Sequence, residues 1–268
     1  MDNTIALIGA PSDCNSSYLA GCAAAPAAVR AALHSPSANS FSENGVDIAA
    51  PGLLFDVGDL PLANRPSDHV AISAAVAAQL ARGRRVLTIG GDHSITWPIV
   101  RAYAPHYPDL AILHFDAHPD LYDDFEGNPF SHASPFARIM EARGAARVIQ
   151  IGIRTMTAHQ RSQAERFGVE VIHAAQFQHA SIALPEGPTY VSLDLDALDP
   201  AFAPGVSHHE PGGLSVRDIL SVIQRAPGTI VGADVVELNP SRDVNGMTAM
   251  VAAKLVRELI GVMAAQRT

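Results

Sequence analysis

The sequence predicts an α/β fold with three layers, in which helices cover both faces of a mostly parallel central sheet. Short β-branched or apolar segments alternate with longer amphipathic segments along the chain, which is typical of parallel strands joined by crossover helices. No linker rich in Pro, Ser and Gly divides the chain, so we expect a single domain spanning residues 1–268. The composition, 48% hydrophobic and 17% charged, suits a domain with a large core.

The expected strands are short apolar segments, and the expected helices are longer and amphipathic. Pro26 and Pro135 suit first helical turns, and Ser215 and Thr248 suit N-caps. The strands are expected at residues 4–9, 52–57, 85–89, 110–115, 147–151, 168–172, 188–195 and 228–236. The helices are expected at residues 26–33, 67–82, 95–103, 135–142, 158–167, 215–224 and 248–265. Two long polar segments, 10–25 and 122–134, are expected to be functional loops.

Charge and composition exclude several classes of protein. The formal net charge is −9, from 18 basic and 27 acidic residues without long runs of like charge, so we expect no nucleic-acid partner. No apolar stretch approaches the roughly 18 residues of a membrane span. The residues from Met1 to Thr4 lack the basic start of a signal peptide, and we expect Cys14 and Cys22 to be reduced. These features predict a cytoplasmic protein.

Three expected strands, 85–89, 110–115 and 188–195, run directly into clusters of His and Asp. Because sites in open parallel sheets form beyond the carboxyl ends of the strands, we expect these clusters to converge. Side chains two residues apart in an extended segment share a face, so alternate residues of each cluster point the same way. This pattern yields six candidate metal ligands: His93, Asp116, His118, Asp120, Asp194 and Asp196.

The four aspartates of this set indicate bound cations. Two carboxylates about 4 Å apart repel by roughly 4 kcal/mol at an effective dielectric constant of 20. Four in one crevice require either raised pKa values or cations, and two divalent ions balance four negative charges. Nitrogen and carboxylate ligands without thiolate favour Mn²⁺ or Fe²⁺ over Zn²⁺. Two such ions sharing a water molecule lower the pKa of that water, which predicts a hydrolase with a dinuclear metal centre.

The motifs that contain these residues resemble the signature of the arginase/agmatinase (ureohydrolase) family. They are, in order, residues 90–94 (GGDHS), 116–120 (DAHPD) and 194–200 (DLDALDP). The resemblance spans nearly the whole chain and is closest to plant-type arginases and their bacterial relatives. It includes residues 125–128 (FEGN), 131–134 (SHAS), 199–213 (DPAFAPGVSHHEPGG) and 246–250 (GMTAM). It implies an arginase-like single-domain fold and two Mn²⁺ per subunit.

The resemblance also implies which residues bind each metal. One Mn²⁺ takes His93, Asp116, Asp120 and Asp194, and the other takes Asp116, His118, Asp194 and Asp196. Asp116 and Asp194 therefore bridge the two ions.

Three residues have catalytic roles by the same resemblance. Asp120 accepts a proton from the attacking water and passes it to the leaving amine, and His132 shuttles protons. Glu237, which follows the last expected strand, binds the guanidinium group of a small cationic substrate. A carboxylate suits this role because it can pair with a guanidinium through two hydrogen bonds.

The substrate is less closely defined than the metal centre. The expected reaction is the hydrolysis of L-arginine to L-ornithine and urea. The first alternative is the hydrolysis of agmatine to putrescine and urea, and the second is the hydrolysis of another guanidino or formimino compound. Many arginases hold the amino-acid end of arginine with polar residues after the DAHxD motif and with an Asp after the Gly-Ile-Arg strand. Here those places have Tyr122, Thr155 and Thr157. Asn128, Ser131 and Glu126 are the expected polar substrate contacts, and residues 15–17 and 208–209 are candidate contributions from the rim.

Other expectations concern assembly and the remaining histidines. Family members usually form homotrimers or homohexamers, so we expect one of these. A catalytically silent metal-binding scaffold is the non-enzymatic alternative, and the intact catalytic residues argue against it. His114 lies two residues before Asp116 and suits a contact behind the metal ligands. His208 and His209 suit the loop surface or the substrate rim, and the other histidines, including His179, are expected to be structural.

Overall fold

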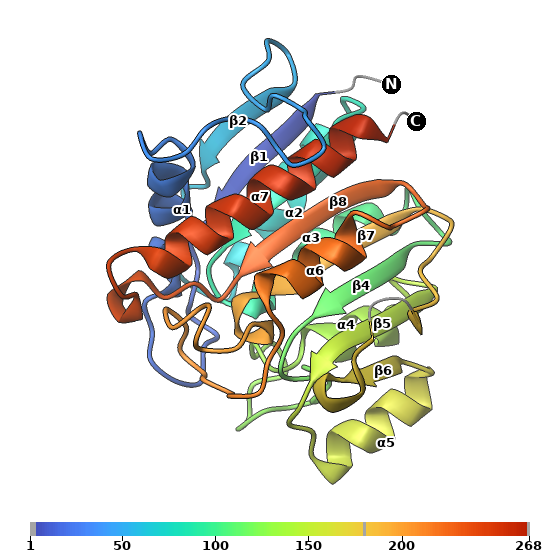
Figure 1. Cartoon of the computed structure of the whole chain (residues 1–268). Helices are drawn as coiled ribbons and strands as arrows, with labels where there is room; N and C mark the ends of the chain where they lie inside the picture. Colours follow the sequence, from blue (N-terminus) through green and yellow to red (C-terminus); the bar gives the residue numbers. More distant parts are fainter. Residues whose placement is uncertain (1–3, 179–180, 267–268) are drawn as a thin grey trace.

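The computed structural model describes residues 4–178 and 181–266, and within them eight strands form one sheet (Figure 1). His179 lies outside the described residues. The strand order is β2-β1-β3-β8-β7-β4-β5-β6, and every neighbouring pair is parallel. The strands are β1 (Ile5–Ala10), β2 (Leu54–Asp59), β3 (Arg85–Gly90), β4 (Ala111–Phe115), β5 (Arg147–Ile153), β6 (Glu170–His173), β7 (Thr189–Asp194) and β8 (Ile230–Val236). The predicted α/β class is confirmed.

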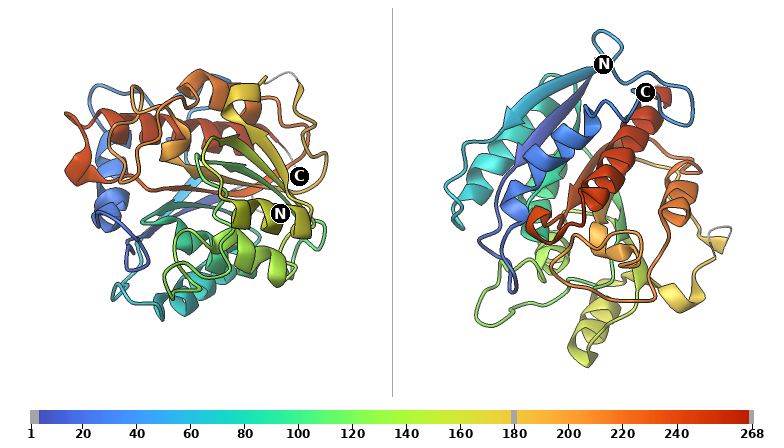
Figure 2. Two further views of the ribbon diagram at one scale, coloured as in Figure 1. Left: turned by 90° about the horizontal axis from the view of Figure 1, so that it is seen from below. Right: turned by 60° about the vertical axis from the view of Figure 1, so that its left-hand side comes forward.

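Seven α-helices of the described chain pack on the two faces of this sheet (Figure 2). They are α1 (Ala25–Leu33), α2 (Asp68–Leu80), α3 (Thr96–Tyr103), α4 (Pro135–Glu141), α5 (Ala158–Phe167), α6 (Val216–Ile223) and α7 (Met247–Ala265). Helices α1, α6 and α7 contribute to one hydrophobic cluster, and α2, α3, α4 and α5 contribute to the other. The predicted three layers are confirmed, while the extent of one domain over residues 1–268 stays a prediction.

Alternation along the strands explains how one sheet supports two cores. In β1, Ile5 and Leu7 belong to the cluster under α1 and α7, whereas Ala6 and Ile8 belong to the cluster under α2 and α3. All six residues of β1 are buried, as expected for a strand covered on both faces. Strand β1 is therefore covered by helices on both faces of the sheet.

Two outer strands begin two residues later than the sequence pattern suggested. The edge strand β2 starts at Leu54 instead of residue 52, because Gly52 has a φ of 82° that an extended strand does not adopt. The other edge strand, β6, starts at Glu170 because Gly168 ends α5 in the left-handed conformation. Both shifts occur where glycine serves a turn, and neither affects the central strands.

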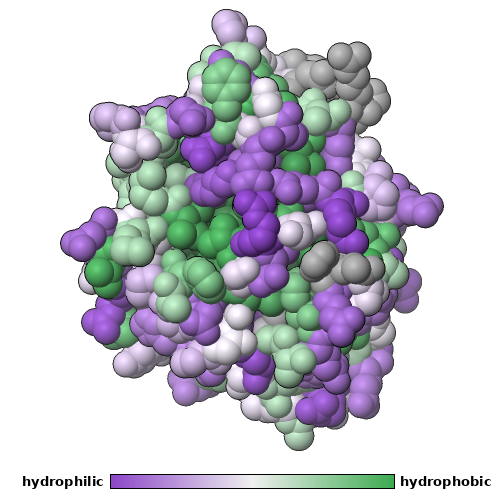
Figure 3. All heavy atoms as spheres, in the orientation of Figure 1, coloured by the Kyte–Doolittle hydropathy of each residue, from purple (hydrophilic) through white to green (hydrophobic). Residues whose placement is uncertain are grey.

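The molecular surface mixes hydrophilic and hydrophobic residues. Figure 3 shows a broad hydrophilic band on the face that bears α6 and α7. Glu43 pairs there with Arg217 of α6 and with Lys254 of α7, which links the two helices. Among the described residues, no helix combines the length and the apolar character needed to cross a bilayer.

Candidate metal centre and active site

The six candidate ligands converge beyond the carboxyl ends of neighbouring central strands. His93 follows β3, Asp116 follows β4, and Asp194 ends β7, while β8 lies between β3 and β7 in the sheet. Strand β4 ends at Phe115, so Asp116 to Asp120 lie in the following loop and not on the strand. Their common direction therefore comes from the loop conformation rather than from strand alternation.

One nitrogen atom, His93 Nδ1, lies at the centre of the first ligand group. It is 3.1 Å from an oxygen of Asp116, 3.0 Å from an oxygen of Asp120 and 3.2 Å from an oxygen of Asp194. These are the four residues assigned above to one metal ion. The structure brings all of them together in a buried position.

The second ligand group surrounds His118. Its Nδ1 is 3.0 Å from Asp196 Oδ2 and 3.4 Å from Asp116 Oδ1. The two oxygens of Asp116 thus face different histidines, which suits a carboxylate shared by two ions. Asp194 directs Oδ2 to the first group and uses Oδ1 to accept the backbone N–H of Asp196, at 2.7 Å. The ligand atoms of Asp116, His118 and Asp196 lie within 4.8 Å of one another, close enough to share one ion.

A buried hydrogen-bond chain leaves His93 Nδ1 available to a cation. Asp234 Oδ2 accepts from Thr96 and Tyr190, and its Oδ1 accepts from Ser192 Oγ at 2.8 Å. Because the Ser192 hydroxyl donates to Asp234, its oxygen is free to accept His93 Nε2–H, at 3.0 Å. The proton on Nε2 leaves a lone pair on Nδ1, which has no hydrogen-bond partner and faces three carboxylate oxygens. A cation satisfies this arrangement, so the residues fit a bound metal ion.

His114 supports the bridging carboxylate from behind. Its Nδ1 accepts from Gln150 Nε2 at 3.1 Å, which leaves Nε2–H to donate to Asp116 Oδ2 at 2.8 Å. Burial is the largest influence on His114 and lowers its pKa to about 4, so the ring is neutral near pH 7. His114 therefore orients Asp116 through a contact behind the metal ligands.

Without metal, Asp120, Asp194 and Asp196 resist ionisation, whereas the neighbouring histidines hold the pKa of Asp116 well below its usual value. Burial, followed by the charge of Asp116, raises the pKa of Asp120 to about 6. Burial and the charges of Asp196 and Asp116 raise the pKa of Asp194 well above its usual value. The pKa values rise because like charges repel one another in a poorly solvated crevice. A divalent cation bound there would offset this repulsion.

Glu237 and His132 form a pair beside the metal ligands. Glu237 Oε1 accepts from His132 Nδ1 at 2.8 Å and from the backbone N–H of His93 at 2.9 Å, while the thiol of Cys22 donates to Oε2. Burial alone would raise the pKa of Glu237, but the nearby imidazole of His132 lowers it to about 2. Burial would lower the pKa of His132, but the Glu237 carboxylate raises it to about 9. Each residue stabilises the charged form of the other.

His132 is also linked to the loop that precedes α1. Its Nε2 lies 2.8 Å from Ser17 Oγ and 3.2 Å from the backbone nitrogen of Ser17. This loop, residues 10–25, was expected to be functional, and it follows β1, the neighbour of β3 in the sheet. Ser17 thus lines the site, and its expected contribution to the substrate rim stays a prediction.

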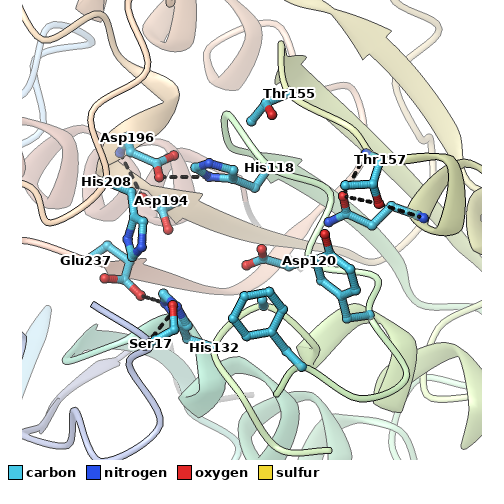
Figure 4. Close-up of a pocket in the computed structure, with 14 residues that line it drawn as sticks. Ser17, His118, Asp120, His132, Thr155, Thr157, Asp194, Asp196, His208 and Glu237 are labelled. Atoms are coloured by element: carbon cyan, nitrogen blue, oxygen red, sulfur yellow. Dashed lines mark hydrogen bonds and ion pairs between the residues drawn. The ribbon is translucent and has the colours of Figure 1, made fainter. Parts of the chain in front are cut away.

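A cavity of about 160 Å³ opens above these groups. Figure 4 shows Asp120, Asp194, Asp196 and Glu237 directed toward it. Its outer wall contains Tyr122, Phe125, Thr155, Thr157 and Gln160, which carry no formal charge. The cavity therefore has an acidic floor and a neutral entrance. Tyr122, Thr155 and Thr157 lie where the sequence comparison placed the outer end of the substrate.

Asn128 and Ser131 do not line this cavity. They line a neighbouring pocket of about 140 Å³, which shares Ser17 and Phe125 with the main cavity. Asn128 Nδ2 donates to Asn15 Oδ1, and Ser131 Oγ accepts the backbone N–H of Ala133. Their assignment as substrate contacts stays a prediction.

The turn after β3 brings the N-terminal loop against His93. The backbone N–H of Asp92 donates to Ser12 O at 2.8 Å, and a Cβ atom on Gly91 would lie 1.7 Å from that same oxygen. Only glycine permits this approach. The Gly91 carbonyl in turn accepts the backbone N–H of Glu237, so one turn positions both a metal ligand and the predicted guanidinium ligand.

Two site residues have an unusual backbone conformation. Asp120 has a φ of 49° and Glu237 has a φ of 67°, in the left-handed region that side chains other than glycine rarely adopt. Such strain is concentrated at functional positions, where the surrounding structure enforces it.

Proteins of known family resemble this chain over most of its length. "Arginase 1, mitochondrial" of Oryza sativa subsp. indica is 49% identical, over 94% of this chain and 79% of that protein. The solved structure of arginase from Medicago truncatula superposes with a TM-score of 0.91 at 45% identity and covers 97% of this chain and 87% of that one. An agmatinase of Bacillus anthracis is 34% identical, over 97% of this chain and 91% of that protein.

These relatives contradict the expected cytoplasmic location. The rice relative is named as a mitochondrial protein, as is an arginase of Medicago truncatula that is 47% identical to this chain. The expectation rested on the first residues and on the lack of a signal peptide. Cellular location depends on targeting signals that are separate from the fold, so these observations could not establish it.

The comparisons agree with the geometry of the site. The family model described as "Arginase family" matches residues 3–261, a range that includes the six clustered ligands, His132 and Glu237. With this match and the similarity of the plant arginases over nearly the whole chain, the protein belongs to the arginase family.

Proposed function

We propose that the protein hydrolyses L-arginine to L-ornithine and urea with a pair of Mn²⁺ ions. The observation that supports this most directly is the position of Glu237. This buried carboxylate lines the cavity beside the six candidate ligands, and it is held in its ionised form. A guanidinium group is a planar cation that a carboxylate can bind through two hydrogen bonds. The charges thus suit a guanidino substrate.

Two divalent ions would occupy the clustered ligands. The first would be held by His93, Asp116, Asp120 and Asp194, and the second by Asp116, His118, Asp194 and Asp196. The oxygen-rich ligand set with two imidazoles supports Mn²⁺ as the native metal. When bound, the two ions supply Lewis acidity that lowers the pKa of a water molecule toward neutrality.

The protein's own residues would position the substrate and move the protons. Glu237 holds the guanidinium group with its carbon facing the metal ligands. Asp120 lines the cavity, and its carboxylate accepts the proton released by the attacking water. That proton passes to the nitrogen that departs as the amine of ornithine. His132, linked to Glu237 and Ser17, exchanges protons between this nitrogen and the solvent.

The outer part of the cavity supports arginine ahead of agmatine. Helix α5 points its amino end at the cavity through its N-cap residue Thr157 and through Gln160. The amino end of a helix favours negative charge. The α-carboxylate of arginine gains from this position, whereas agmatine has no carboxylate. The plant arginases are also more similar to this chain than the bacterial agmatinase is, at 49% against 34% identity.

Urea release from L-arginine and from agmatine tests the proposal, with the metal content measured on the same preparation. We expect two Mn²⁺ per chain and a clear preference for L-arginine. A preference for agmatine would assign the alternative substrate, and release of formamide from a formimino compound would assign a third. Asp194→Ala is the negative control, because it removes a proposed bridging ligand and should abolish both metal binding and activity.

We also infer a homotrimer or homohexamer, because members of this family usually assemble in this way. The mass of the Mn²⁺-loaded protein in solution, measured by light scattering, tests this inference. A monomeric mass at micromolar concentration would contradict it.

A further inference from the structure

His208 lies in the wall of the main cavity and has no part in the mechanism described above. It belongs to the loop between β7 and α6, in the segment GVSHHEPGG. Its ring centre is 5.1 Å from that of His132 and 6.1 Å from that of His118. Figure 4 shows the ring beside Glu237, on the side of the cavity opposite Thr157. His208 therefore adjoins both the predicted guanidinium ligand and the metal ligands.

The backbone around His208 is fixed on both sides. Val206 pairs with Leu238, the residue after Glu237, and Ser207 Oγ donates to Leu19 O at 2.8 Å. On the other side, His209 Nε2 lies 2.7 Å from Pro204 O and donates to it. The loop thus holds the His208 ring in a defined place next to Glu237, which is a requirement for a residue that selects a ligand.

The nitrogen atoms of His208 differ from those of the other site histidines. Each of His93, His114, His118 and His132 directs at least one ring nitrogen to a carboxylate of the site. Across residues 4–178 and 181–266, no hydrogen bond engages either ring nitrogen of His208. A half-buried imidazole at a cavity wall with both nitrogens unused is available to a ligand.

A guanidinium bound at Glu237 would lack acceptors for part of its hydrogen atoms. The group has several N–H donors in one plane, and a single carboxylate satisfies two of them. The cavity wall on the far side, at Thr155 and Thr157, lies toward the entrance. His208 lines the cavity, and a neutral imidazole there has one ring nitrogen that can accept such a hydrogen atom.

We propose that His208 is a substrate-binding residue whose ring nitrogen accepts an N–H of the guanidinium group held by Glu237. This inference rests on the proposed function and deepens it, because it assigns a second protein contact to the guanidinium. It predicts selection for substrates with a terminal guanidinium, since a terminal amidine with fewer N–H donors would leave one acceptor unpaired.

The test compares four variants loaded with Mn²⁺: His208→Ala, His208→Phe, His208→Asn and the control His106→Ala. His106 is an exposed histidine between α3 and β4, outside the cavity, so its loss should leave all values unchanged. Loss of a hydrogen bond to a charged group should raise the KM for L-arginine about 10- to 100-fold in His208→Ala and His208→Phe. The inhibition constant of the guanidinium ion should rise in parallel, while kcat, metal content and Tm stay near the unmodified values. His208→Asn, which keeps an acceptor, should recover part of the loss.

Two outcomes would overturn the proposal. An unchanged inhibition constant for guanidinium in His208→Ala would show that the ring makes no contact with it. Full retention of affinity in His208→Phe would assign a stacking role in place of the hydrogen bond. If the unmodified enzyme releases no urea from L-arginine, the proposed function fails separately, and calorimetric titration of guanidinium ion into the same four variants still tests His208.

Discussion

The chain from His93 through Ser192 to Asp234 makes a quantitative prediction about metal binding. Ser192→Ala removes the hydroxyl that lies 3.0 Å from His93 Nε2 and 2.8 Å from Asp234 Oδ1. All three side chains are fully buried, so water cannot replace the hydroxyl. His93 Nε2 and one oxygen of Asp234 would each lose a partner.

The expected cost follows from these two lost partners. A buried polar atom without a partner costs about 1–3 kcal/mol, so the metal-free fold should lose about 2–6 kcal/mol. For a chain of this size, that loss corresponds to a decrease in Tm of at least about 4 °C. The His93 ring would also lose the contact that keeps the proton on Nε2. Loss of such a partner behind a ligand typically lowers metal affinity about 10- to 100-fold.

Calorimetric titration of Mn²⁺ and thermal unfolding with and without metal measure the two effects. Thr88→Val is the matched control, because the Thr88 hydroxyl is also buried on a central strand but has no hydrogen-bond partner. Its removal breaks no hydrogen bond, so Mn²⁺ affinity should stay unchanged and Tm should not fall. If Ser192→Ala behaved like Thr88→Val, the hydroxyl would not fix the state of His93, and the reasoning would be refuted.

Three further predictions concern other parts of the site. Glu237→Gln should retain both metal ions and raise the KM for L-arginine at least about 10-fold, because it removes the charge that pairs with guanidinium; loss of a metal ion in elemental analysis would show that Glu237 is a ligand instead. Gly91→Ala should displace the Ser12 loop and lower Tm by several degrees, whereas an unchanged Tm and activity would mean that the turn adapts to a Cβ atom 1.7 Å from Ser12 O. The stabilisation by Mn²⁺, measured as the difference in Tm, should grow as the pH rises from 5 to 8. Burial raises the pKa of Asp120 to about 6 and that of Asp194 well above its usual value. Protonation of these two groups therefore stabilises the metal-free fold at low pH, and this stabilisation is lost as the pH rises through the raised pKa values. Mn²⁺ replaces the bound protons, and a pH-independent difference in Tm would contradict this account.

The fold could be predicted from the sequence because hydrophobic periodicity and turn residues agree along the chain. Segments such as β1 and β8 are buried throughout, and their continuous apolar character identifies central parallel strands. None of the six residues of the edge strand β2 is buried, so the strand lacks this character, and its start was misplaced. Central elements are encoded locally, whereas edges depend on glycine conformations that the pattern does not show.

The metal ligands could be predicted because His and Asp residues cluster directly after three predicted strands, and because four neighbouring aspartates require cations. The residues behind them were missed for the opposite reason. Ser192 looks like an ordinary core residue, and Gln150 and Cys22 look like isolated polar positions in apolar segments. Asp234 did give a signal, since it is a charged residue within the fully buried segment IVGADVV. Its partners, however, come from α3 and β7 as well as from the site, and only the folded structure brings them together.

The left-handed backbone at Asp120 and Glu237 lowers the stability of the fold at two positions that the proposed reaction needs. Each such conformation costs on the order of 1 kcal/mol relative to glycine at the same position. A screen that selects only for thermal tolerance would therefore favour glycine at both positions, and each replacement would remove a group on which the proposed reaction depends. The most heat-resistant descendants of this protein would tend to be its least active ones, and stabilisation without loss of function has to be sought at positions remote from the strand ends.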